Sequence, residues 1–296
     1  MVCVHALKYG SRLPMSSQSP KVVLITGTSS GIGLAAAVAA ARAGWTTVAT
    51  LRDPSRSDAL RKAAADAGVE LDIRRLDVTD QASITAAVDG VLADYGRLDA
   101  VVNNAGAGHL GTLENESVAE VRGVMEVNFF GVLNVSKAAM PHLRASGGRL
   151  ITVTSVGGVV GQPFNEAYCA AKFAVEGYME SLAPVAAAHG VSVTVIEPGA
   201  VATEFVANVG VDLEGAVAAA GVYAPQLAAY LNRTVGQFLD GAQTAEGAAE
   251  SVLEALTAER PAFRLQTSEW ARGFVGTKLS DVDGSAVLGL TGGWVA

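Results

Sequence analysis

Several kinds of residue are scarce in this sequence, and each scarcity narrows what the chain can be. Its two cysteines, Cys3 and Cys169, are too few for a disulfide framework in 296 residues, which favours a reducing cytoplasm. Its four histidines are scattered without the spacing of metal ligands, so we predict no metal site. No apolar stretch approaches the roughly 20 residues that a membrane-spanning helix requires.

Positive charge is scarce as well. Lys and Arg number 21 against 29 Asp and Glu, which gives a net charge of −8. An acidic chain without a long basic run is a poor candidate for binding nucleic acid or an anionic membrane surface. Residues 1–20 contain Lys8 and Arg12 but lack the unbroken apolar region of a signal peptide, so we predict a flexible N-terminal extension.

From residue 21 onward, short β-branched runs alternate with long alanine-rich stretches. Strand-like runs lie at 21–26, 45–50, 69–78, 98–104, 149–155, 191–199 and near 262–266. Helical patterns lie at 31–43, 55–67 and 82–95, then through about 144, at 166–188 and at 244–257. Gly44 and Gly68 each follow a helical pattern directly, which is typical of a helix end.

This alternation predicts the fold class. Strands that are apolar throughout, each followed by a helix, indicate a parallel sheet covered on both faces. Right-handed crossovers then give an α/β fold with a doubly wound, Rossmann-type parallel sheet in three layers, formed by a single domain over 21–296. Ligands of such sheets bind beyond the carboxyl ends of the strands. The pattern loosens after Gly199, and we predict that residues 200–240 bind the substrate.

A glycine-rich motif, "TGTSSGIG" at 26–33, lies directly between the first strand and the first helix. Its glycines do not fit the G-x-G-x-x-G spacing, but they fit a looser T-G-x-x-x-G-x-G turn with the same physics. Glycines let the backbone approach a pyrophosphate, and unpaired N–H groups at the helix start attract its charge. An ordinary Gly/Ser-rich turn is the alternative. We predict that the turn binds a dinucleotide through Gly27, Ser29, Ser30, Gly31, Ile32 and Gly33.

The residues after the second strand indicate which dinucleotide binds. Dinucleotide sites commonly have an acidic residue about 20 positions after the last glycine, and Asp53 fits that distance. Leu51, however, occupies the position from which an acid would bind the ribose hydroxyls, and Asp53 is placed to start the next turn. Arg52, together with a serine of the glycine turn, is placed to hold a 2′-phosphate. We therefore predict NADP(H) rather than NAD.

Six motifs of this chain occur together in a recognisable order. They are "TGTSSGIG", "NNAG" at 103–106, Asn128 in "NFFG", Ser155, "YCAAK" at 168–172 and "PG" at 198–199. In this order and at these spacings they resemble the short-chain dehydrogenase/reductase family, over about residues 21–265. "VATLRDP" and the segment around "YCAAK" most resemble the branch of estradiol-type 17-beta-hydroxysteroid dehydrogenases and retinol dehydrogenases. Residues 200–240 match the family only loosely.

The motif "YCAAK" suggests acid–base chemistry. Tyr168 and Lys172 lie four positions apart and share a face of a helix, although a surface pair is the alternative on these five residues alone. A phenol with a pKa of about 10 is a poor acid–base group near neutrality, and we expect the neighbouring ammonium to lower that pKa. Ser155, at the end of a strand, is placed to steady the same substrate oxygen. We predict that Tyr168 exchanges a proton with the substrate, Ser155 orients it and Lys172 tunes Tyr168.

The family resemblance assigns the remaining site residues. It implies that Lys172 also binds the nicotinamide ribose and that Asn128 holds a water that extends the proton path. It implies cofactor contacts for Asp77, Val78, Asn104, Ala105, Gly106, Pro198, Gly199, Val201 and Thr203. Two alternatives remain open: Asp77 is also placed to cap a turn, and residues 104–106 are also typical of a plain turn.

Together these inferences predict an NADP(H)-dependent ketone reductase or alcohol dehydrogenase. The resemblance implies a bulky apolar substrate, such as a steroid, a retinoid or a polyketide, and a homodimer or homotetramer. An alternative is a cofactor-sensing regulatory or scaffold protein of the same fold. Such proteins usually lose the tyrosine or the lysine, and this chain has both. An enoyl reductase is disfavoured because those relatives space the tyrosine and the lysine more widely.

Overall fold

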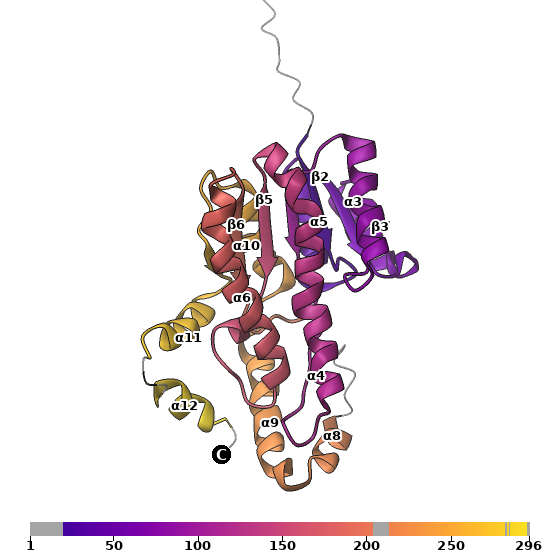
Figure 1. Cartoon of the computed structure of the whole chain (residues 1–296). Helices are drawn as coiled ribbons and strands as arrows, with labels where there is room; N and C mark the ends of the chain where they lie inside the picture. The colour runs from indigo at the N-terminus through magenta and orange to yellow at the C-terminus, as the bar shows by residue number, and fades with distance from the viewer. Residues whose placement is uncertain (1–19, 204–212, 282, 284, 295–296) are drawn as a thin grey trace, which may run out of the picture.

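The computed structural model describes residues 20–203, 213–281, 283 and 285–294 (Figure 1). The predicted N-terminal extension, except for residue 20, lies outside the described residues. The described part of the chain forms one seven-stranded sheet in the order β3-β2-β1-β4-β5-β6-β7, and every neighbouring pair is parallel. The strands are β1 (Val22–Thr26), β2 (Thr46–Leu51), β3 (Asp72–Arg75), β4 (Ala100–Asn103), β5 (Arg149–Val153), β6 (Ser192–Glu197) and β7 (Arg264–Gln266).

The helices alternate with the strands as the sequence predicts, up to β6. Those that pack on the sheet are α1 (Gly31–Arg42), α2 (Asp58–Ala67), α3 (Gln81–Tyr95), α5 (Gly131–Ser146), α6 (Glu166–Ala187) and α10 (Ala245–Thr257). The short helix α4 (Val118–Met125) precedes α5, has no buried residue and lies beyond the strand ends (Figure 1). Short turns of helix lie at η1 (Pro54–Arg56), η3 (Val156–Gly158) and η4 (Gly221–Tyr223). Glycines in the left-handed conformation end α2, α3 and α5, because they close the last turn without a Cβ clash.

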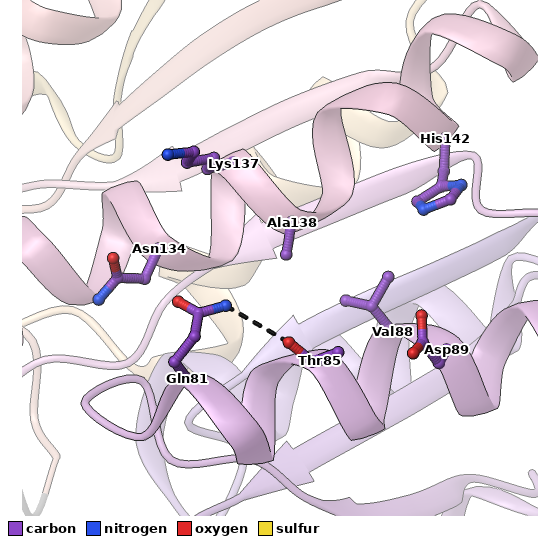
Figure 2. A pocket seen from close by; sticks show the side chains of 8 residues that line it. All are labelled: Gln81, Thr85, Val88, Asp89, Asn134, Lys137, Ala138 and His142. Atoms are coloured by element: carbon purple, nitrogen blue, oxygen red, sulfur yellow. Dashed lines mark hydrogen bonds between the residues drawn. The ribbon is translucent and has the colours of Figure 1, made fainter.

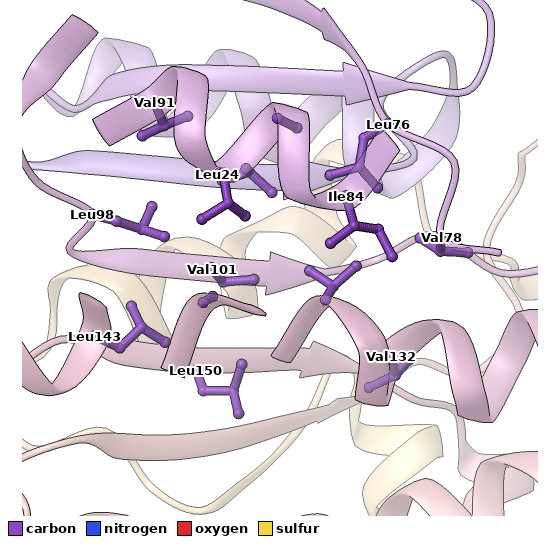
Figure 3. Packing of buried hydrophobic residues seen from close by; sticks show 14 of the residues in the cluster. Leu24, Leu76, Val78, Ile84, Val91, Leu98, Val101, Val132, Leu143 and Leu150 are labelled. Carbon is purple, nitrogen blue, oxygen red and sulfur yellow. The ribbon is translucent and has the colours of Figure 1, made fainter. Parts of the chain in front are cut away.

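The sheet has a hydrophobic cluster on each face, which confirms the predicted three layers. Residues of α3, α5 and α6 cover one face, where Leu24 and Val101 of the sheet pack under Ile84 and Val132 (Figure 3). Residues of α1, α2 and α10 cover the other face, with α10 lying behind the sheet in Figure 1. The first strand, β1, lies inside the sheet, and β2 and β3 follow it outward to one edge. The next strand, β4, lies on the other side of β1, so the direction in which strands are added reverses there. In sheets of this kind, ligands bind outside the carboxyl ends of the strands at such a reversal, which here lies between β1 and β4.

The long helical pattern that the sequence predicts up to about residue 144 is interrupted in the structure. A π-helical turn, η2 (Glu126–Phe130), separates α4 from α5, and it contains Asn128. Such turns hold an extra residue and occur frequently at functional sites. Ser117 begins α4 with a capping box to Glu120, whose two hydrogen bonds satisfy donors at the helix start.

Further helices lie beyond the carboxyl ends of the strands, in the lower half of Figure 1. They are α8 (Leu213–Ala219), α9 (Ala224–Gly241), α11 (Glu269–Leu279) and α12 (Ser285–Gly292). Their apolar residues form a third cluster with η3, in which Phe164 and Leu227 are buried. In the predicted substrate segment 200–240, the described residues 200–203 form a loop, and residues from 213 onward are mostly helical. None of the described helices is both long and apolar enough to cross a lipid bilayer.

Candidate active site

Tyr168 and Ser155 meet at the carboxyl end of β5. Ser155 lies two residues after the end of this strand, and Tyr168 lies in the first turn of α6, close enough for the Ser155 side chain to affect the pKa of the phenol. The Ser155 hydroxyl oxygen also accepts a hydrogen bond of 3.0 Å from the backbone N–H of Gly157, which orients it. Burial raises the pKa of the Tyr168 phenol above its ordinary value, and the hydrogen bond to Ser155 opposes that shift. Tyr168 is therefore protonated at neutral pH.

Lys172 lies behind Tyr168 and is almost fully buried. Its ammonium nitrogen is 5.7 Å from the centroid of the Tyr168 ring and donates a 3.2 Å hydrogen bond to the carbonyl oxygen of Val153. Burial lowers the pKa of Lys172 to about 8, and the charge of Glu176 opposes that shift. The sequence-based expectation of a lowered Tyr168 pKa differs from the structure, in which burial raises that pKa.

Asn128 connects the π-helical turn to the loop after β4. Its side-chain nitrogen donates to the carbonyl oxygens of Ala107, at 3.0 Å, and Val124, at 3.1 Å. Its side-chain oxygen accepts from the N–H of Ala107 at 3.1 Å. Both N–H groups of the Asn128 side chain are therefore bonded within the chain, and Ala107 is held in place. A water bound by Asn128 could only donate to its side-chain oxygen, and this binding stays a prediction.

Gly106 lies against two of these side chains. A Cβ atom added to this residue would come within 2.9 Å of the Asn128 side-chain oxygen and 3.6 Å of the Lys172 nitrogen. The structure therefore brings Asn128, Ser155, Tyr168 and Lys172 to the same end of the sheet, as the sequence predicts.

The glycine turn between β1 and α1 has no room for side chains at two positions. Gly27 has a φ of +70°, and a Cβ added there would lie 2.7 Å from the Cα of Ala105. A Cβ on Gly33 would lie 2.3 Å from both the carbonyl oxygen of Gly27 and the side-chain nitrogen of Asn104. This backbone geometry is the kind that lets a phosphate approach closely.

Asn104 and Ala105 hold the glycine turn from the neighbouring strand. The Asn104 side chain donates to the carbonyl oxygens of Thr26, at 3.0 Å, and Gly27, at 2.9 Å. The backbone N–H groups of both residues donate to the Thr26 hydroxyl at 3.0 Å. The predicted motif at 104–106 is thus in direct contact with the predicted pyrophosphate turn.

The first turn of α1 is open to an anion. Ser30 occupies the cap position without a side-chain hydrogen bond to the helix, and the first turn contains no acidic residue. Peptide N–H groups and the helix dipole favour negative charge at such an end. Thr203, from the loop after β6, lies over this turn, because a Cβ on Gly31 would be 3.1 Å from its methyl carbon.

Asp53 starts the turn after β2, as its alternative interpretation predicts. Its carboxylate accepts hydrogen bonds from the N–H of Ser55, at 3.0 Å, and from the Ser55 hydroxyl, at 2.7 Å. These bonds hold the pKa of Asp53 below its ordinary value. Arg52 is exposed at the end of the strand, whereas Leu51 is buried in the core. The acidic residue at the expected distance is thus engaged within the chain, and the basic residue beside it faces outward.

Asp77 and Val78 also use their side chains within the chain. Asp77 accepts hydrogen bonds from the N–H and the hydroxyl of Thr79, at 3.0 and 2.8 Å, which is the turn-capping alternative. Val78 packs in the core, where a Cβ on Gly131 would come within 2.7 Å of its methyl group. Contacts of these two residues with an adenine stay predictions.

The loop after β6 is held by contacts with two other segments, one beside Ser155 and one after α9. The carbonyl oxygen of Pro198 accepts a 2.9 Å hydrogen bond from the N–H of Val156, next to Ser155. Val201 forms a β-bridge with Gln243, at the end of α9. A Cβ on Gly199 would be 2.9 Å from the ring of Trp270, which stacks on Phe274 of α11.

Neither helices α11 and α12 nor the position of Trp270 were predicted from the sequence patterns. A local signal for α11 is its cap residue Ser268, whose hydroxyl accepts a hydrogen bond from the N–H of Ala271. The contacts of the loop at 107–117 were not predicted either. In that loop His109 contacts the Glu116 carboxylate at 2.5 Å, and the N–H of Gly111 donates to Phe164 in front of α6.

One cavity lies outside this arrangement, between α3 and α5 (Figure 2). It has a volume of about 430 Å³. It is lined by Gln81, Thr85, Val88, Asp89, Asn134, Lys137, Ala138 and His142. None of the predicted site residues lines it, so it plays no part in the arrangement around Tyr168.

Comparisons with known proteins point in one direction. The sequence profile of the short chain dehydrogenase family matches residues 21–214. The chain is 41% identical to 17-beta-hydroxysteroid dehydrogenase type 1 of Mus musculus over 252 residues, which are 83% of this chain and 73% of that protein. It is 35% identical to retinol dehydrogenase 8 of Homo sapiens over 280 residues, 91% of this chain and 88% of that protein. A short chain dehydrogenase/reductase from Burkholderia phymatum, solved in complex with NAD, matches with a TM-score of 0.75 at 26% identity, over 89% of this chain and 94% of its own.

Proposed function

Because the chain belongs to the short-chain dehydrogenase/reductase family of oxidoreductases, we propose that it interconverts a ketone and a secondary alcohol with NADP(H). The observation that carries this proposal is that Tyr168 lies close to Ser155, with the buried Lys172 nitrogen 5.7 Å from the centroid of the Tyr168 ring. A proton donor, a second hydroxyl and a buried cation are thereby grouped where such sheets bind their ligands.

Each of these side chains has a role in the reduction direction. A bound nicotinamide would supply the hydride. Tyr168 gives its proton to the substrate oxygen, and burial supports this role by keeping the phenol protonated. Ser155 donates a hydrogen bond to the same oxygen as negative charge develops there. The charge of Lys172 stabilises the phenolate that remains, and oxidation uses the same groups in reverse.

The residues around the glycine turn fit a dinucleotide. The start of α1 offers N–H groups without a competing carboxylate, and the close packing at Gly27 and Gly33 favours backbone contact with the pyrophosphate. Arg52 would hold the 2′-phosphate of NADP(H), since guanidinium groups pair well with phosphate. The hydrogen bonds between Asp53 and Ser55 support NADP(H) over NAD, because NAD binding would use an acidic side chain to hold the ribose hydroxyls and the Asp53 carboxylate is already bonded to Ser55.

A bulky apolar substrate is supported by the surroundings of Ser155. The helical turn η3 follows this residue, and its Val156 belongs to the third hydrophobic cluster, with Phe164, Leu227 and Phe274. These residues come from segments beyond the strand ends, where a substrate would lie over the cofactor. The relatives' names, a hydroxysteroid dehydrogenase and a retinol dehydrogenase, also favour ring-containing or long apolar substrates.

The decisive test is a panel of ketones and alcohols, including steroid, retinoid and aromatic polyketide members, assayed by NADPH absorbance. We expect large multi-ring ketones to be reduced faster than small sugars or hydroxy acids. The Tyr168→Phe variant should lose this activity. NADPH binding without turnover of any member would instead favour the cofactor-sensing regulatory protein.

We also propose that the chain forms a homodimer or homotetramer. Large apolar side chains are exposed on α6 and the adjoining π-helical turn, at Phe130, Phe173, Tyr178 and Val185. Exposed large apolar side chains of this kind are common at interfaces between protein chains. Light scattering of the purified protein should give at least twice the mass of one chain, and Phe130→Ser combined with Tyr178→Ser should lower it.

A further inference from the structure

A cluster of buried charges lies behind the proposed proton donor. Glu176 follows Lys172 by four positions on α6, so Tyr168, Lys172 and Glu176 occupy successive turns of one helix face. Lys172 and Glu176 are each only 4% exposed. Glu197, at the end of β6, is fully buried, and Arg264 of β7 contacts both carboxylates. Buried charges are costly unless they are paired, so this arrangement requires a reason.

Arg264 does not satisfy Glu176 completely. Its Nη1 atom is 3.2 Å from Glu197 Oε1 and 3.4 Å from Glu176 Oε2. Glu197 also accepts a 2.8 Å hydrogen bond from Gln266, and the Nη2 atom of Arg264 contacts the exposed Glu180 at 2.7 Å. Glu176 Oε2, in contrast, has no hydrogen-bond partner within the described part of the chain. Of the two buried carboxylates, Glu176 is the one with an oxygen that lacks a hydrogen bond and has only the longer contact with Arg264.

The other oxygen of Glu176 contacts Thr154, the neighbour of Ser155. Thr154 Oγ1 lies 2.5 Å from Glu176 Oε1 and 2.9 Å from the carbonyl oxygen of Ile196. A hydroxyl has one proton to donate, and a carbonyl oxygen only accepts. When Glu176 is ionised, the Thr154 hydroxyl therefore donates to it. When Glu176 carries a proton, it donates to Thr154, which then donates to Ile196.

This geometry lets Glu176 change its charge without leaving a neighbour unpaired. The Ile196 carbonyl accepts a 2.7 Å hydrogen bond from the Thr154 backbone N–H whichever way the hydroxyl points. Burial raises the pKa of Glu176 to about 7, the Thr154 hydrogen bond opposes that shift, and Glu197 adds to it. The charges of Arg264 and Lys172 lower the pKa of Glu176 more weakly. Glu176 and Lys172 therefore change charge in neighbouring pH ranges.

We propose that Glu176 is a positioning residue that acts through Lys172, and that its negative charge keeps Lys172 an ammonium at the alkaline end of the working pH range. The proposal rests on the proposed function, in which that ammonium stabilises the Tyr168 phenolate. The remaining charged groups that face Glu176 are Arg264 from β7 and Glu197 from β6. Both are bonded to each other, so their charges largely cancel.

The test compares the pH profiles of Glu176→Gln and the parent. Glutamine keeps the shape and can still bond Thr154, but it carries no charge. We expect the alkaline limb of kcat/KM for ketone reduction to move to lower pH by about one unit. Near pH 6, where Glu176 is mostly protonated in the parent, the two proteins should have rates within about twofold. A structural defect would instead lower the rate equally at every pH, and that result or an unmoved limb would overturn the proposal.

Two further variants support this comparison. Glu180→Gln is the matched control, because Glu180 contacts the same arginine from the solvent side, and its profile should equal that of the parent. Thr154→Val removes the hydroxyl that stabilises ionised Glu176, so it should move the limb in the same direction as Glu176→Gln. If Glu176→Gln does not fold, an unmoved limb in Thr154→Val overturns the proposal on its own.

A readout without turnover separates this inference from the proposed function. The ¹³C signal of the Lys172 side chain, identified by its loss in Lys172→Met, can be titrated directly by NMR. A lower pKa of Lys172 in Glu176→Gln supports the inference even if the parent reduces no ketone, which would refute only the proposed function. An equal pKa of Lys172 in both proteins, with normal ketone reduction by the parent, would overturn the inference alone.

Discussion

Tyr168 and Lys172 lie one turn apart on α6, with the ammonium nitrogen of Lys172 5.7 Å from the centroid of the Tyr168 ring. The same nitrogen donates to the carbonyl oxygen of Val153, which fixes it at the end of β5. Burial acts on the two groups in opposite directions, since it raises the pKa of the phenol and lowers that of the ammonium. The phenol can therefore act as an acid at neutral pH, which suits the reduction of a ketone.

Replacing Tyr168 with phenylalanine should remove the proton donor while the ring still packs beside Lys172. We expect NADPH-dependent ketone reduction to fall by about 10²- to 10⁴-fold, the range that general acid catalysis contributes. NADPH affinity, measured by fluorescence titration, and the melting temperature should change little. Tyr178→Phe, on the exposed side of the same helix, should keep the parent rate. A Tyr168→Phe variant with most of the parent rate would contradict the proposed role.

The rate of ketone reduction should fall as the pH rises through about 8. Burial lowers the pKa of Lys172 to that value, so the ammonium loses its proton there, whereas the raised pKa of Tyr168 keeps the phenol protonated. The profile of kcat/KM against pH reports the ionisations of the free enzyme and is the relevant measurement. A profile that stays flat well above this pH would show that Lys172 is not the group whose charge limits the reaction.

The preference for NADPH over NADH should depend on Arg52. Arg52→Ala should reduce the ratio of the two dissociation constants by about tenfold or more, since a hydrogen bond to a charged group contributes about 1.5–3 kcal/mol. Asp53→Asn is the matched control, because asparagine can still accept the hydrogen bonds of Ser55 and the ratio should not change. Equal dissociation constants for both dinucleotides in the parent would refute the assignment of NADP(H).

Gly33→Ala should destabilise the protein and weaken dinucleotide binding together. The added methyl group would lie 2.3 Å from the Gly27 carbonyl oxygen and the Asn104 side chain, and such overpacking costs about 1–3 kcal/mol. Gly177→Ala, in a part of α6 with open space, should instead be neutral or stabilise by up to about 1 kcal/mol. Urea unfolding and NADPH titration of both variants test this contrast. A Gly33→Ala protein that binds NADPH normally would argue against close backbone contact at the turn.

Much of the fold could be predicted because its signals are local. The apolar runs at β1 and β5 and the glycines after α2, α3 and α5 are visible in the sequence. The break between α4 and α5 was not visible, since the π-helical turn contains neither glycine nor proline. Its position depends on the hydrogen bonds between Asn128 and Ala107, which are 21 positions apart. Helices α11 and α12 pack through a cluster whose members come from distant segments, so their patterns alone did not reveal them.

The candidate site was predictable to the extent that spacing determines it. The glycine turn, Ser155 and the Tyr168–Lys172 pair were placed correctly at the strand ends from their order in the chain. The direction of the Tyr168 pKa shift was not, because it depends on burial, which spacing does not reveal. The burial of Glu176 was not predicted either. A glutamate in a helix usually faces water, and only the packing against β5, β6 and β7 shows that this one is buried.

The π-helical turn that carries Asn128 has a consequence for how this chain tolerates change in length. A π turn contains one residue more than the α turn that would replace it, so deleting a residue within 126–130 would let a continuous α-helix form. The buried face of α5 would keep its contacts with the sheet, while Asn128 would no longer be positioned to bond Ala107 in the loop after β4. We expect a shortened protein of this kind to fold but to lack the proposed activity, so that a change of one codon would separate the fold from the function.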